Sequence, residues 1–204
     1  RGVAVLKAFR LKLDEHQVKK VFAFGTSALR SAKNKEEVLD AFQREAGISV
    51  SIIDGLREAE LIYAGVKKAV DIEEVSLIVD IGGGSVEYIL CNGEKVLWMQ
   101  SFEMGGQRLL ERFMKKDPLP QQEIPRMQSY FRETLLPLTN AIHQYQPKVL
   151  IGSSGSFDTL NDLLFHETTG TWPPADQPGS TPTAVTRASL GTSVGGSGSL
   201  APLR

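Results

Sequence analysis

The 204-residue sequence lacks several features that mark whole classes of protein. It contains one cysteine, Cys91, so no disulfide can form within the chain, and a reducing compartment such as the cytoplasm is expected. No apolar run approaches the roughly 18 residues that a membrane-spanning helix needs. The first residues also lack the apolar core and cleavage site of a signal peptide. We therefore expect a cytoplasmic protein that does not bind membranes.

Charge of one sign is not in excess either. The chain has 23 Lys and Arg against 24 Asp and Glu, which gives a formal net charge of -1 at pH 7. Such a chain has no long-range field that would hold DNA, RNA or an anionic membrane surface nonspecifically. Nucleic acid is thus not an expected partner, and an anionic ligand has to be bound by local groups.

The hydrophobic pattern predicts an α/β protein with two domains. Strand-like and helix-like stretches alternate within residues 1–70, and three strand-like segments follow between Ser76 and Phe102. A second domain over residues 71–166 is expected to contain these strands in a mixed sheet with flanking helices. Gly, Ser, Thr and Pro dominate residues 167–204, which predicts a disordered tail because little apolar surface is available for burial.

The clearest candidate for chemistry is the segment from Asp80 to Glu87, Asp-Ile-Gly-Gly-Gly-Ser-Val-Glu. An apolar strand ends in a carboxylate, and the three glycines that follow let backbone N–H groups approach an anion closely. In Walker and Rossmann loops a helix follows the glycines, whereas Val86 and the residues after it are typical of a strand. The pattern therefore favours a phosphate loop within a hairpin, and a plain glycine-rich turn is the simpler alternative.

Three further motifs occur in the same chain. They are Gly-Thr-Ser-Ala-Leu-Arg at residues 25–30, Gly-Leu-Arg-Glu-Ala at residues 55–59, and Ile-Gly-Ser-Ser-Gly-Ser at residues 151–156. With the glycine loop, this ordered set over residues 1–165 resembles the exopolyphosphatase and guanosine pentaphosphate phosphatase (Ppx/GppA) family. The resemblance implies the actin-like ATPase superfold, which is ribonuclease-H-like.

The resemblance also implies an activity and a set of site residues. The expected enzyme is a phosphoanhydride hydrolase that releases terminal orthophosphate from inorganic polyphosphate or guanosine pentaphosphate. Glu58 would be the catalytic base for the attacking water, and Asp80 and Glu87 would hold Mg²⁺, mostly through its waters. The phosphate-binding residues implied are Arg30, Gly82, Gly83, Gly84, Ser85, Gly155 and Ser156.

Several alternatives stay open at this point. The sequence does not distinguish polyphosphate from guanosine pentaphosphate as the substrate. A homodimer is neither required nor excluded. A non-catalytic protein that binds polyphosphate or an alarmone, or an ATP-using member of the same superfold, would also fit. The chain lacks the first Asp-x-Gly phosphate loop of the family and the usual continuation of its second domain. It also begins with Arg1, so we expect a truncated member whose own activity is an open question.

Overall fold

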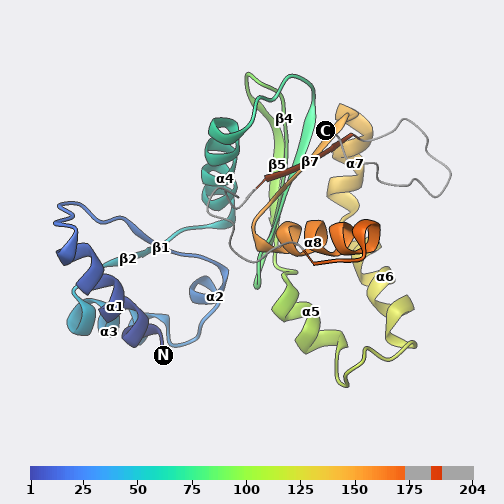
Figure 1. Cartoon of the computed structure of the whole chain (residues 1–204). Coiled ribbons are helices and arrows are strands. Elements are labelled where there is room, and N and C mark those ends of the chain that lie inside the picture. The colour runs from blue at the N-terminus through green and yellow to red at the C-terminus, as the bar shows by residue number, and fades with distance from the viewer. Residues whose placement is uncertain (173–184, 190–204) are drawn as a thin grey trace. The chain divides into compact units, whose positions relative to one another are not determined.

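A computed structural model describes residues 1–172 and 185–189 of the chain (Figure 1). They belong to two compact units, Arg1–Arg57 and Glu58–Arg204. Each unit combines helices with a sheet, as the α/β pattern predicted. Among the helices of the described residues, none is both long enough and apolar enough to cross a membrane.

The first unit contains a two-stranded parallel sheet. Its elements are α1 (Gly2–Glu15), β1 (Ala23–Gly25), α2 (Ser27–Arg30), α3 (Lys35–Ala46) and β2 (Val50–Ile52). Gly25 of β1 is paired with Ile52 of β2, so both strands end at the same edge of the sheet. The loops that follow the two strands therefore leave the sheet side by side.

The second unit is built on a five-stranded mixed sheet. Its elements are α4 (Gly55–Ala69), β3 (Ser76–Ile81), β4 (Val86–Cys91), β5 (Val96–Phe102), α5 (Gly106–Phe113), α6 (Glu123–Thr134), α7 (Leu136–Tyr145), β6 (Val149–Ser153), α8 (Gly155–Thr169) and β7 (Val185–Ser189). The strand order is β5-β4-β3-β6-β7. Among the described strands of this sheet, only the central β3 and its neighbour β6 pair in parallel, so their carboxyl ends, and the loops that follow them, meet at one edge.

Two apolar clusters cover the two faces of this sheet, because successive strand residues point to opposite faces. On one face Ile78 and Ile89 pack with Ala59 and Val66 of α4. On the other face Leu77, Val79 and Leu90 pack with Leu138 and Ala141 of α7. Figure 1 shows α4 and α7 on opposite sides of the strands.

Two boundaries differ from those predicted. The units divide between Arg57 and Glu58 rather than after residue 70, because α4 buries Ala59 in the core of the second unit. The disordered tail predicted from residue 167 is wrong for residues 167–169, which complete α8, and for residues 185–189, which form β7 on the edge of β6. A strand can pair there through backbone hydrogen bonds, without large apolar side chains. Gly170 caps α8, and the parts of that prediction at residues 173–184 and 190–204 lie outside the described residues.

Candidate functional site

The glycine segment forms the turn of a β-hairpin, as its sequence predicted. The ladder between β3 and β4 ends at the pair Ile81 and Val86. The N–H of Gly82 then donates to the carbonyl of Ser85 at 3.0 Å and closes the turn. No helix follows directly, so the loop differs from the Walker and Rossmann types.

The carbonyl groups of this turn are bound by the first residues of α5. The backbone hydrogen bonds run from Gly105 to Gly84 (3.1 Å), from Gly106 to Gly82 (3.0 Å) and from Gln107 to Gly83 (2.8 Å). The first N–H groups of a helix have no partner within it. Here the carbonyl groups of the glycine loop are those partners, so the N–H groups at the start of α5 are already hydrogen-bonded within the protein.

This docking sets the direction of the loop N–H groups. In a planar trans peptide the carbonyl and the N–H point to opposite sides. Because the three glycine carbonyls face α5, the N–H groups that follow them face away from it. Among the described residues, the N–H groups of Gly83 and Gly84 donate to no other backbone group. Successive N–H groups directed to one side form a concave site for an anion.

The loop and α5 approach so closely that a side chain at the contact would not fit. A Cβ atom at Gly105 would lie 2.5 Å from the carbonyl carbon of Gly83 and 2.5 Å from the nitrogen of Gly84. At Gly83, by contrast, a Cβ atom would meet nothing within 4 Å. Gly105 is therefore required for docking, whereas the surface of Gly83 is open to a ligand.

Two carboxylates lie side by side at the base of the loop. Asp80 of β3 is the direct partner of Glu87 on β4, and directly opposite residues project from the same face of a sheet. Ser153 donates from its Oγ to Asp80 Oδ2 at 2.9 Å, and Ser101 donates from its Oγ to Glu87 Oε1 at 2.6 Å. These four side chains form one polar row across β6, β3, β4 and β5.

Glu87 is the buried carboxylate of this row, whereas Asp80 is half-buried. Its side chain is buried, with 1% of the residue exposed. Burial raises the pKa of its carboxyl group, hydrogen bonds from Ser101 and Ser85 partly oppose that shift, and the charges of Glu58 and Asp80 raise it further. The half-buried Glu58, in the first turn of α4, thus belongs to the same electrostatic environment. Among the described residues no group of three or more His, Cys, Asp or Glu is arranged to hold a metal ion by itself.

The second predicted phosphate loop lies beside the first. Parallel pairing of β3 with β6 brings the start of α8 to the carboxyl end of β3. There Ser154 and Ser156 donate from their hydroxyl groups to the carbonyl of Ile81, at 3.3 and 3.1 Å. The hydroxyl of Ser156 is therefore bound to the chain, which leaves its backbone N–H and that of Gly155, at the positive end of α8, to face an anion.

Arg30 is the one predicted site residue that lies in the first unit. It is half-buried in α2, and its Nη1 donates to the carbonyl of Ile53 at 3.0 Å. This contact ties the loop after β1 to the segment between β2 and α4. The other predicted site residues all lie in the second unit.

Sequence reasoning missed the residues that support the loop from behind. Gly105 and Arg108 contact the glycine turn, and Ser101 and Ser153 hold the two carboxylates. These contacts join strands and a helix that are distant in the chain, so local patterns do not reveal them. The Gly-Gly pair at residues 105–106 is a local signal, but by itself it indicates no more than the start of a helix.

Comparisons with known proteins show what the chain is similar to as a whole. Residues 1–169 match the model of the Ppx/GppA phosphatase family. A crystal structure of an exopolyphosphatase from Cytophaga hutchinsonii is 49% identical, with a TM-score of 0.77 over 82% of this chain and 55% of that one. The crystal structure of the Aquifex aeolicus Ppx/GppA family member is 31% identical, with a TM-score of 0.63 over 86% of this chain and 54% of that one.

The chain thus spans just over half the length of these solved structures. The ordered set of motifs that suggested the family in the sequence lies within the matched region. The predicted α/β class with a mixed sheet is confirmed, and the two solved structures show the fold of the family itself. The chain belongs to the Ppx/GppA phosphatase family.

Proposed function

We propose that this chain contributes the phosphate-binding loops and the metal-binding carboxylates of a phosphoanhydride hydrolase. Its substrate would be inorganic polyphosphate or guanosine pentaphosphate, from which it releases the terminal orthophosphate. One observation carries the proposal: the N–H groups of Gly83 and Gly84 face away from α5, in a hairpin whose base holds Asp80 and Glu87 side by side. The similarity to a protein described as an exopolyphosphatase supports the same substrate class.

The carboxylates have the chemistry that Mg²⁺ prefers. Glu87 is buried close to the charges of Asp80 and Glu58, and a bound cation would offset this repulsion. Each serine hydroxyl bonds one oxygen of its carboxylate, so acceptor sites remain. Asp80 and Glu87 would hold the ion together with waters and phosphate oxygens, as is usual for Mg²⁺. When bound, the ion would neutralise charge on the transferred phosphoryl group.

The residues of the chain then have distinct tasks. The N–H groups of Gly83, Gly84 and Ser85 and those of Gly155 and Ser156 would bind oxygens of the terminal phosphate, while the N–H of Gly82 holds the turn closed through the carbonyl of Ser85. Glu58 would accept a proton from a water molecule, whose oxygen forms a bond to the terminal phosphorus. The bridging P–O bond breaks, and its electron pair leaves with the shortened chain. Arg30 would bind a further phosphate of the same substrate.

The decisive experiment measures phosphate release from long-chain polyphosphate, guanosine pentaphosphate and ATP in the presence of Mg²⁺. We expect release from one of the first two substrates. The rate should fall by about 10²- to 10⁴-fold in Glu58→Gln, with tripolyphosphate binding retained. Glu60→Gln, an exposed glutamate of the same helix, is the control and should keep the rate.

The other outcomes would identify a different function. Equal rates in the unaltered chain and Glu58→Gln would remove the proposed base. Release from ATP alone would favour the ATP-using alternative. Binding of tripolyphosphate without release from any substrate would favour a non-catalytic binding protein.

A further inference from the structure

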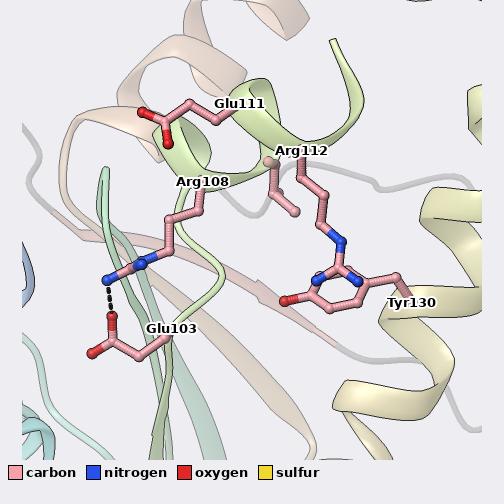
Figure 2. Close-up of a pocket in the computed structure, with 6 residues that line it drawn as sticks. Glu103, Arg108, Glu111, Arg112 and Tyr130 are labelled. Atoms are coloured by element: carbon pink, nitrogen blue, oxygen red, sulfur yellow. Dashed lines mark hydrogen bonds and ion pairs between the residues drawn. The ribbon is translucent and has the colours of Figure 1, made fainter. Parts of the chain in front are cut away.

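Arg108 contacts the glycine loop from the side opposite to the proposed phosphate site. Its Nε donates to the carbonyl of Gly84 at 2.8 Å, and its Nη2 forms an ion pair with Glu103 Oε2 at 2.6 Å. The guanidinium therefore lies between the end of the loop and the segment that joins β5 to α5. Its side chain is 37% exposed and lines a pocket of about 310 Å³ together with Arg112 and Tyr130 (Figure 2).

We propose that Arg108 is a positioning residue that holds the glycine loop in its anion-binding orientation. The inference rests on the proposed function, since it concerns the same loop. It adds a residue that no sequence motif marked, and it explains why a charged side chain is directed at a backbone carbonyl behind the site.

The reason is the freedom of glycine. A loop of three glycines can bring N–H groups close to an anion, but glycine also adopts backbone conformations that other residues avoid. Rotation of the peptide between Gly84 and Ser85 would direct a carbonyl oxygen, rather than an N–H, at the phosphate. The Gly84 carbonyl has two donors on the α5 side, the N–H of Gly105 and the Nε of Arg108. A hydrogen bond from a charged donor is stronger than one between neutral groups, so Arg108 opposes this rotation.

Glu103 strengthens the same arrangement from the other side. Its carboxylate binds Nη2 while Nε binds the loop, so the planar guanidinium is held at two of its nitrogens. Figure 2 shows the Glu103 and Arg108 side chains directed at each other, while Glu111 of the same helix points elsewhere.

Arg112 provides a matched control one helical turn further along α5. It carries the same charge and lines the same pocket, but its guanidinium stacks over the ring of Tyr130, 4.2 Å from the centroid (Figure 2). Removing Arg112 changes the charge of the region by the same amount as removing Arg108. It leaves the hydrogen bond from Arg108 to Gly84 in place.

The test compares the unaltered chain with Arg108→Ala, Arg108→Lys and Arg112→Ala in two measurements. The first is the amide NMR spectrum of the ligand-free protein, in which the Gly84 and Ser85 resonances report the loop. The second is the dissociation constant for tripolyphosphate in the presence of Mg²⁺. Thermal unfolding verifies that each variant is folded.

We expect Arg108→Ala to shift the Gly84 and Ser85 resonances and to weaken tripolyphosphate binding by roughly tenfold, the effect of one charge-assisted hydrogen bond. Arg108→Lys keeps a charged donor and should restore part of the affinity. Arg112→Ala should leave both measurements unchanged. Unshifted loop resonances and full affinity in Arg108→Ala would overturn the inference, as would an equal loss of affinity in Arg112→Ala.

If the unaltered chain does not bind tripolyphosphate, the proposed function fails instead, and the ligand-free resonances still decide the role of Arg108.

Discussion

At the scale of single residues, Glu87 has the least favourable environment for a negative charge within the candidate site. It is almost fully buried, and the carboxylates of Glu58 and Asp80 are close enough to raise its pKa beyond the effect of burial. The hydroxyl groups of Ser101 and Ser85 only partly compensate. A buried carboxylate close to two other carboxylates is a position that a bound cation would stabilise.

The raised pKa of Glu87 predicts a specific pH dependence of stability. The folded protein binds the proton more tightly than the unfolded chain, in which the pKa is near its ordinary value of 4.5. The stabilisation is therefore fully present below that pH and is lost as pH rises through the folded pKa. Glu87→Gln should flatten this decline in metal-free thermal unfolding between pH 4 and pH 7. It should also abolish any stabilisation by Mg²⁺, and the same decline in both proteins would contradict the assignment.

A substitution at Gly83 tests whether the open side of the loop binds the anion. A Cβ atom at Gly83 would meet no atom of the described residues within 4 Å, so Gly83→Val should fold with an unfolding midpoint close to that of the unaltered chain. The added methyl groups would occupy the space where the phosphate contacts the N–H groups. Tripolyphosphate binding, measured by calorimetry, should weaken by about tenfold or more, as expected for the loss of a charge-assisted hydrogen bond. Unchanged affinity would exclude this loop as the anion site.

At the scale of secondary-structure elements, the start of α5 acts as the support of the hairpin turn. Three helix N–H groups bind three glycine carbonyls, and this requires the backbones to approach without an intervening side chain. The support is thus an element-to-element contact, which neither the helix nor the hairpin would form alone.

Gly105→Ala should break this contact. The new Cβ atom would lie 2.5 Å from backbone atoms of Gly83 and Gly84, and backbone cannot move aside as a flexible side chain would. We expect a loss of about 1–3 kcal/mol in the free energy of unfolding, measured with urea. Gly106→Ala is the matched control, since its Cβ atom meets nothing within 4 Å and should change that free energy by less than about 1 kcal/mol. Equal effects of the two substitutions would show that the close approach is not responsible.

The hairpin was predictable from sequence because its signals are local. Two apolar, strand-like runs and the glycines between them are enough to predict β3, the turn and β4, and the motif resemblance assigned Asp80 and Glu87 to the same site. The support from Arg108 and Gly105 was not predictable, since a docked helix start and an ordinary helix start share the same local pattern. The domain boundary was misplaced for a related reason: α4 follows the first unit in sequence, yet it buries Ala59 and Val66 in the second.

At the scale of the whole molecule, the balance of charge determines how a polyanion can arrive. The net charge is -1, so no overall positive field draws a negatively charged substrate to the protein. Under the proposed function, binding should then depend on the loop N–H groups, on Arg30 and on the proposed metal ion, which act only at short range.

This balance predicts a weak effect of salt on association. At fixed Mg²⁺, the stopped-flow association rate of tripolyphosphate should change by about twofold or less between roughly 50 and 200 mM salt, because long-range attraction is absent. A protein with a strongly basic surface would instead lose most of its association rate over that range. A steep fall of the association rate would mean that a local cluster of basic side chains attracts the anion. The variant Arg30→Gln, which removes the proposed phosphate-binding arginine of the first unit, would then show whether that cluster includes Arg30.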